Sequence, residues 1–118
     1  MKILLVDDNA MIRKSFSHFL SFAGHTITTA ENGHDACDRI AENIPDLIIC
    51  DLMMPEISGV SFIQIIRDYL HYNIPIIVIS TLDKGKTISE HLGKNIEFMP
   101  KPVLYDELLQ KVNTYSKI

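Results

Sequence analysis

The sequence predicts one open α/β domain over residues 1–118, with a doubly wound parallel sheet of five strands in the order 2-1-3-4-5. The first observation behind this is three continuous runs of apolar, often β-branched residues, at Ile3–Val6, Leu47–Cys50 and Ile74–Ile79. Continuous rather than alternating runs are typical of strands that are covered on both faces. The second observation is that helical spacing fills the segments between the runs, and strands joined by crossover helices run parallel.

Four stretches carry apolar residues at steps of three and four, which predicts helices whose stripes face the core. They are Ile12, Phe16, Phe19, Leu20 and Ala23; Ala36, Cys37, Ile40, Ala41 and Ile44; Val60, Ile63, Ile66 and Leu70; and Leu104, Leu108, Val112 and Tyr115. A weaker helix is expected over residues 84–94, where Ile88 and Leu92 are the clear apolar pair.

Two further strands are expected at the edges of the sheet. His25–Thr29 and Ile96–Met99 are shorter or more polar than the three continuous runs. Edge strands are the ones that tolerate polar residues, because one side of each faces solvent. This placement gives the predicted strand order.

Composition excludes several classes of protein. With 47% hydrophobic and 22% charged residues, the chain is typical of a soluble globular protein, and its net charge of -4 offers no basic surface for a nucleic acid. The apolar runs are shorter than the roughly 20 residues of a membrane span, and the start of the chain lacks a secretory core of about 7 to 15 residues. We therefore expect a cytoplasmic protein without membrane insertion or direct nucleic-acid binding, with Cys37 and Cys50 as reduced thiols and no separate effector domain in this chain.

Five polar residues stand where predicted strands end: Asp7, Asp8, Asp51, Ser80 and Lys101. The carboxyl ends of parallel strands meet at one edge, with a crevice where the strand order reverses. Carboxylates gathered there repel one another, by about 4 kcal/mol for two charges at 4 Å and an effective dielectric near 20. Oxygen ligands without histidine or cysteine partners suit magnesium, so we expect a magnesium site.

An aspartate beside magnesium and a lysine can act as a nucleophile toward a phosphoryl group. Phosphoryl transfer depends mainly on positioning and on neutralising charge, which a metal, an ammonium group and a hydroxyl supply. The five residues match that chemistry.

These motifs, taken in order, resemble the receiver domains of two-component response regulators, over nearly the whole chain. Residues 4–8, Leu-Leu-Val-Asp-Asp, are similar to the acidic pair after the first strand, and residues 51–59 are similar to the phosphorylation loop. Ser80 and Lys101-Pro102 complete the set. The resemblance implies a flavodoxin-like (βα)5 fold and a signalling role.

The resemblance also implies roles for single residues. Asp51 would accept the phosphoryl group, and Lys101 would contact its oxygen. Magnesium would be held by Asp8 and Asp51 directly, by Asp7 through water and by the carbonyl of Met53. Ser80 would move toward the phosphoryl group and the ring of Phe98 would turn inward, as the switch. The family's cis peptide is expected at Lys101-Pro102, although the sequence alone leaves the isomer open.

One departure from the family pattern concerns access to Asp51. Thr81 stands where a small alanine or glycine is common, and Met53 and Leu82 are apolar along the expected path of water. We expect these three residues to modulate access and to slow self-dephosphorylation.

Several alternatives remain open at this point. Asp8 alone is also a favoured helix N-cap. A magnesium-dependent phosphatase would carry an acid two positions after its nucleophile, where this chain has Met53, and a flavin-binding protein would have a phosphate loop after the first strand. A receiver that works without phosphate is the main rival. The expected partners are a histidine kinase or phosphotransfer protein and an unknown downstream protein, and we expect no enzyme in the sense of turnover.

Overall fold

The computed structural model describes residues 1–52, 59–80 and 95–116. The elements in chain order are β1 (Lys2–Val6), α1 (Ala10–Phe22), β2 (Thr26–Ala30), α2 (Gly33–Glu42), β3 (Leu47–Asp51), α3 (Gly59–Gln64), the π-helical turn η1 (Ile65–Tyr69), β4 (Ile76–Ser80), β5 (Ile96–Pro100) and α5 (Tyr105–Asn113). The expected helix over residues 84–94 lies outside the described residues.

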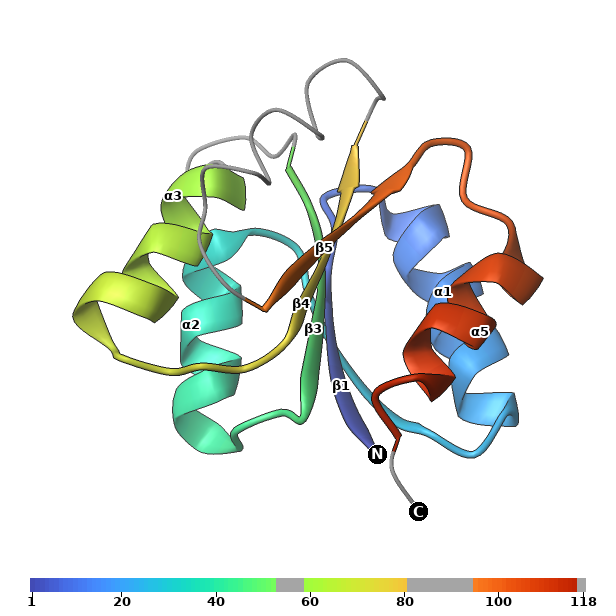
Figure 1. The fold of residues 1–118 in the computed structure, drawn as a ribbon, viewed down its shortest axis with the longest axis horizontal. Helices are drawn as coiled ribbons and strands as arrows, with labels where there is room; N and C mark the ends of the chain where they lie inside the picture. Colours follow the sequence, from blue (N-terminus) through green and yellow to red (C-terminus); the bar gives the residue numbers. More distant parts are fainter. Residues whose placement is uncertain (53–58, 81–94, 117–118) are drawn as a thin grey trace.

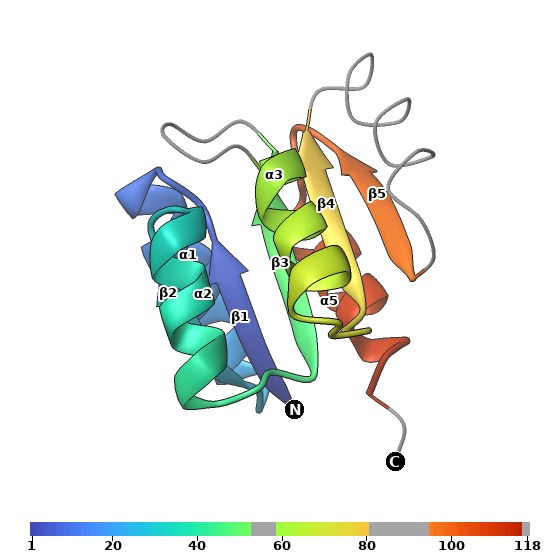
Figure 2. The ribbon, with the colours of Figure 1, turned by 90° about the vertical axis from the view of Figure 1, so that its left-hand side faces the viewer.

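The five strands form one parallel sheet in the order β2-β1-β3-β4-β5, which confirms the predicted topology. Helices α1 and α5 cover one face of the sheet, and α2 and α3 cover the other, so the molecule has three layers (Figure 1). Figure 2 shows α2 and α3 in front of the strands. The fold is therefore the doubly wound arrangement that the sequence predicts.

The central strands are buried on both faces because their alternate side chains enter two separate cores. Every residue of β3 and β4 is buried, as is β1 after Lys2. Leu4, Ile48 and Val78 pack with α2 and α3, whereas the neighbouring positions, such as Ile49, pack with α1 and α5. The two edge strands are only partly buried, as their more polar sequences indicate.

Helix α1 begins after Asn9 rather than after Asp8. The Asn9 side chain accepts hydrogen bonds from the N–H groups of Met11 and Ile12, at 3.0 and 3.1 Å. Asn9 therefore satisfies two of the donors left free at a helix start. The alternative role of Asp8 as the cap is wrong, and both Asp7 and Asp8 remain in the turn after β1.

Five residues assigned to helical core stripes are exposed instead: Ala23, Ala41, Ile44, Leu70 and Leu104. Ala41 lies in the last turn of α2. Helix α2 ends at Glu42, so Ile44 falls in the link to β3. Leu70 follows η1, whose wider turn shifts the phase of the stripe and turns this residue outward. Ala23 and Leu104 occupy cap positions at which the helical stripe has ended or not yet begun.

Arg67 of η1 fastens the end of the sheet that is far from the strand carboxyl ends. Its guanidinium donates to the carbonyl oxygens of Tyr72 at 2.9 Å, Ile74 at 2.8 Å and Asn95 at 3.4 Å. Ile74 lies two residues before the start of β4, and Asn95 directly precedes β5. One side chain thus holds the chain at the point where both strands begin.

None of the helices in residues 1–52, 59–80 and 95–116 is long and apolar enough to span a membrane.

Candidate functional site

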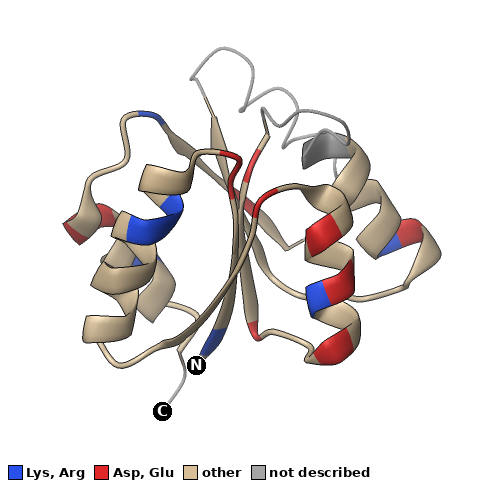
Figure 3. Ribbon diagram, turned by 180° about the vertical axis from the view of Figure 1, so that it is seen from behind, with Lys and Arg blue, Asp and Glu red and all other residues tan. Residues whose placement is uncertain are grey.

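Three carboxylates meet where β1 and β3 end. Asp7 and Asp8 follow β1, and Asp51 is the last residue of β3, which lies beside β1 in the sheet. One carboxylate oxygen from each lies within 4.8 Å of the other two. Acidic positions gather at this end of the central strands in Figure 3. Asp7 is 5% exposed and Asp51 4%, whereas Asp8 faces solvent.

The buried position of Asp7 disfavours the charged form of its carboxyl group. Burial raises the pKa of the Asp7 carboxyl above its usual range, and the charges of Asp51 and Asp8 raise it further. The N–H of Asn9, which donates to Asp7 Oδ1 at 2.9 Å, and the charge of Lys101 act in the opposite direction. Burial is thus the main reason for the raised pKa of Asp7, and the two neighbouring carboxylates add to it.

Lys101 reaches this edge because β5 pairs with β4. Its backbone N–H donates to the carbonyl oxygen of Ser80 at 2.8 Å, directly after the paired residues Ser80 and Pro100. Its side chain then places Nζ 3.2 Å from Asp51 Oδ2. The peptide bond between Lys101 and Pro102 is cis, the isomer that the resemblance implies. Lys101 therefore contacts the most buried of the three acids.

Ser80 ends β4 at the same edge. The residue is fully buried, and its hydroxyl oxygen has no hydrogen-bond partner among the described residues. A buried hydroxyl without a partner is uncommon and calls for an explanation such as a ligand or a moving part.

Phe98 shares a face of the sheet with Ser80. In the register of β4 and β5, Phe98 pairs with Val78 and Pro100 pairs with Ser80. Side chains two residues apart along a strand point to the same face. The Phe98 ring is half-buried, and the two expected switch residues thus lie on one face of adjacent strands.

The structure therefore brings Asp7, Asp8, Asp51 and Lys101 together and carries Ser80 to the same edge of the sheet. The Met53 carbonyl, expected as a metal ligand, and the expected access residues Thr81 and Leu82 lie outside the described residues.

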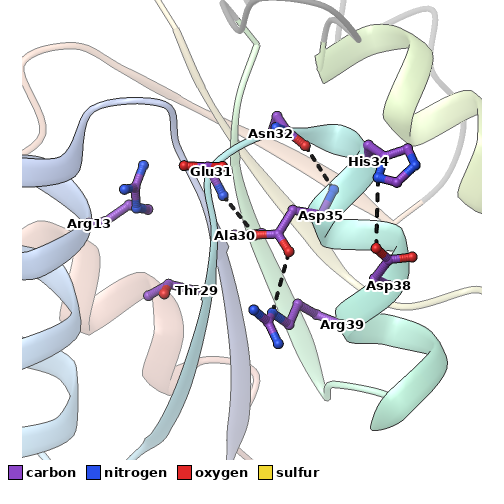
Figure 4. Close-up of a pocket in the computed structure, with 9 residues that line it drawn as sticks. All are labelled: Arg13, Thr29, Ala30, Glu31, Asn32, His34, Asp35, Asp38 and Arg39. Carbon is purple, nitrogen blue, oxygen red and sulfur yellow. Dashed lines mark hydrogen bonds and ion pairs between the residues drawn. The ribbon is translucent and has the colours of Figure 1, made fainter.

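A polar hollow of about 470 Å³ lies at the end of β2, apart from the three acids. Figure 4 shows Arg13 reaching toward it from α1, with four side chains of α2 on the opposite wall. Those four are paired within the helix: Asp35 with Arg39 at 3.6 Å and His34 with Asp38 at 3.7 Å. The Asp35 charge is therefore compensated by Arg39, unlike the charges of the carboxylates around Asp51.

Comparison with known proteins identifies the family. The model of the response regulator receiver domain matches residues 3–113. The chain belongs to this family. It is a receiver domain of the two-component response regulators, which confirms the resemblance drawn from the motifs.

Relatives of this receiver domain share about a third of its residues. Response regulator MprA from Mycobacterium sp. (strain KMS) is 33% identical over 113 residues, which are 95% of this chain and 49% of that protein. The receiver domain thus spans about half the length of the curated relatives it matches.

Two solved structures have the same fold. The chemotaxis response regulator CheY4 of Vibrio cholerae superposes with a TM-score of 0.86 at 29% identity, over 97% of both chains. The receiver domain of the Francisella response regulator 1452 also gives 0.86, at 32% identity, over 97% of this chain and 94% of that one.

Two residues that support the receiver site were not predicted. Asn9 caps α1 and donates its N–H to Asp7, and Arg13 donates from Nη1 to the Asp7 carbonyl oxygen at 2.6 Å. Arg13 lies in the first turn of α1, four residues after Asn9, and its side chain reaches back to the Asp7 carbonyl. A correct placement of the helix start at Asn9 would have put Arg13 in the first turn, close to the Asp7 backbone.

Proposed function

We propose that this receiver domain accepts a phosphoryl group on Asp51 with the help of Mg²⁺, and that phosphorylation switches a partner-binding surface. The observation that carries the proposal is the contact of a buried Asp51 carboxylate with Lys101, beside two further acids. The donor would be a histidine kinase or a phosphotransfer protein, and the readout a downstream protein, in the cytoplasm.

The carboxylate set fits a magnesium ion. Its ligand atoms are oxygens, and three carboxylates lie beside one ammonium group, so a cation would neutralise the remaining negative charge. Asp8, Asp51 and the Met53 carbonyl would hold the ion directly, and Asp7 would hold it through water. When bound, Mg²⁺ supplies positive charge that offsets the repulsion between the carboxylates and an incoming phosphoryl group.

The chain's own residues would carry the transfer. An Asp51 carboxylate oxygen forms a bond to phosphorus while the bond from phosphorus to the donor's leaving atom breaks, and the leaving group keeps that electron pair. The Lys101 ammonium contacts the Asp51 carboxylate. It would bind a phosphoryl oxygen once negative charge has passed from the carboxylate to the phosphoryl group. The Ser80 hydroxyl would donate a second hydrogen bond to the phosphoryl group. It has no other partner among the described residues.

The conformational readout would run through Ser80 and Phe98. Both lie on one face of β4 and β5. Movement of the Ser80 hydroxyl toward the phosphoryl group would vacate space on that face, into which the half-buried Phe98 ring could turn. The altered surface would comprise β5, α5 and the expected helix at residues 84–94. The domain would assist reactions of its own Asp51 without turning over a diffusible product, so we do not class it as an enzyme.

Intact-mass measurement tests this proposal. After incubation with acetyl phosphate and Mg²⁺, the native chain should gain one phosphoryl group, and Asp51→Asn should gain none. Asp68→Asn is the matched control, because Asp68 is an exposed acid on η1, away from the site. A magnesium-free sample should remain unlabelled.

The rival reading is a receiver that binds its partner without phosphate. It predicts no adduct on a folded, magnesium-loaded native chain. That result would overturn the proposal.

A further inference from the structure

An apolar hollow of about 490 Å³ opens directly beside the phosphoacceptor site. Two of its lining residues belong to that site, Asp7 and Lys101. The other lining residues are apolar and come from α1, β4 and the chain after Lys101: Ile12, Phe16, Ile79, Pro102 and Val103. The hollow therefore has a charged end at Asp7 and Lys101, whose Nζ contacts Asp51, and an apolar remainder.

The apolar wall is held in place by packing. The Phe16 ring meets the Tyr105 ring edge to face, with centroids 5.4 Å apart and planes at 82°. Tyr105 is in turn stacked on Phe19, at 4.9 Å. Ile79 is buried in the core beneath. Small-molecule sites are typically preformed, mostly apolar pockets of roughly 300 to 1,000 Å³ with a few polar groups that fix orientation.

The charge distribution specifies the ligand. Lys101 is the cation among the described lining residues, and its Nζ already holds an anionic oxygen, that of Asp51. A ligand that suits both ends has an anionic phosphoryl group at one end and an apolar group of about ring size at the other.

We propose that this hollow binds the acyl group of a small-molecule acyl phosphate, and that the domain prefers donors whose acyl group is apolar and ring-sized. This inference rests on the proposed function and names a substrate class for the same site. The Asp51 carboxylate takes the phosphoryl group, the bond between phosphorus and the acyl oxygen breaks, and the donor leaves as a carboxylate anion. Charge balances without a proton or a further reactant.

The preference is measured by comparing benzoyl phosphate with acetyl phosphate as donors to the native chain with Mg²⁺. Phosphorylation of Asp51 is followed by intact mass over a range of donor concentrations. Burying the phenyl ring should lower the half-saturating concentration about tenfold relative to acetyl phosphate.

Filling the hollow provides the matched variants. Ile12→Trp places a large ring in the hollow and should reduce the preference for benzoyl phosphate to below about threefold. Ile44→Trp is the control, because Ile44 is an exposed isoleucine before β3, at the opposite end of that strand from Asp51. It should keep the native preference.

Equal half-saturating concentrations for the two donors in the native chain would overturn the inference and leave phosphorylation of Asp51 standing. That is the result expected if the hollow instead receives an apolar side chain of a partner protein. An unchanged preference in Ile12→Trp, shown to be folded by its thermal unfolding, would also overturn it. Labelling by neither donor would overturn the proposed function itself, and this inference with it.

Discussion

Two groups of charged residues in this domain differ in how well they are neutralised. The Asp51 site (Asp7, Asp8, Asp51 and Lys101) sets three carboxylates against one ammonium group, and two of its acids are buried. The β5–α5 cluster (Glu97, Lys111 and Tyr115) sets one carboxylate against an ammonium group and a phenol. Lys111 Nζ lies 2.7 Å from Glu97 Oε2, and the Tyr115 hydroxyl donates to Glu97 Oε1.

The carboxyl pKa values move in opposite directions in the two groups. Burial, aided by neighbouring carboxylates, raises the pKa of Asp7. The hydrogen bond from Lys111, followed by that from Tyr115, lowers the pKa of Glu97. The β5–α5 cluster therefore fastens α5 to β5, whereas the three carboxylates of the Asp51 site have room for the added positive charge that the proposed function calls for. The predictions below contrast the two groups, beginning with the largest expected effect.

Removing the lysine of each group should show that only Lys101 contributes to phosphorylation of Asp51. Lys101→Ala should slow phosphorylation of Asp51 by acetyl phosphate about 100-fold, because a preorganised charge on the phosphoryl oxygen is lost. Lys111→Ala, outside the site, should change that rate less than twofold. Initial rates from intact mass measure both, and equal effects would erase the distinction between the groups.

Magnesium should stabilise only through the Asp51 site. At a concentration 100 times its Kd, Mg²⁺ should raise the free energy of unfolding by about 2.7 kcal/mol. Asp8→Asn should remove most of this gain, and Glu97→Gln should retain it. Chemical unfolding with and without Mg²⁺ gives the values. A full magnesium response in Asp8→Asn would exclude Asp8 as a ligand.

Neutralising one carboxylate should have opposite effects in the two groups when no divalent ion is present. Asp7→Asn should raise the free energy of unfolding by about 1 kcal/mol, because it removes repulsion between buried charges. Glu97→Gln should lower it by about 0.5 kcal/mol, a small loss because the Glu97 pair is partly exposed. Urea unfolding in a chelator measures both changes. If Asp7→Asn destabilised the domain, the charge surplus would not be what sets the stability of this site.

The smallest expected effect is a pH-dependent one in the β5–α5 cluster. Tyr115→Phe should cost about 0.5 kcal/mol, as a partly exposed hydrogen bond to a carboxylate is lost. The Glu97 pKa lies below its ordinary 4.5 in the folded state, so its contribution is present above pH 4.5 and disappears as pH falls through the folded value. The Tyr115 pKa lies above its ordinary 10.0, chiefly through burial and then through Glu97.

The Tyr115 contribution is therefore present below pH 10.0 and is lost as pH rises through the folded value. The difference between Tyr115→Phe and the native chain should be greatest between pH 4.5 and 10.0. Thermal unfolding of both proteins at intervals of about one pH unit, from about pH 3 to 9, measures how the stability difference declines at acidic pH. A difference independent of pH would mean that Tyr115 acts by packing alone.

Most of the fold could be predicted because the apolar pattern of each strand reflects whether one or both of its faces are buried. Ile48 and Ile49 are both apolar since adjacent residues enter the two different cores, and this makes a continuous run. Asp51 and Ser80 end such runs, so the parallel topology alone places them at one edge. Their roles in phosphoryl transfer and switching remain predictions.

Local features that depend on tertiary geometry could not be predicted. The periodicity continued to Leu70, but η1 changes the helical phase there, and no residue in the stripe signals a π turn. Asp8 and Asn9 are both good N-caps, and the choice depends on where the chain leaves β1. The cluster of Glu97 with Tyr115 joins residues 18 positions apart, beyond any local pattern.

The Arg67 contacts determine which positions near the start of β4 tolerate substitution. The guanidinium binds carbonyl oxygens, which every amino acid supplies, so exposed Asn73 can change identity without losing these contacts. Tyr72 and Ile74 are restricted by their packing in the core. Because strand side chains alternate faces, a slip of one position in β4 would point Ser80 to the wrong face. The contact at Ile74 therefore helps to fix the register of Ser80, about 20 Å further along the chain. Substitutions at Arg67 itself should be far less tolerated than those at Asn73.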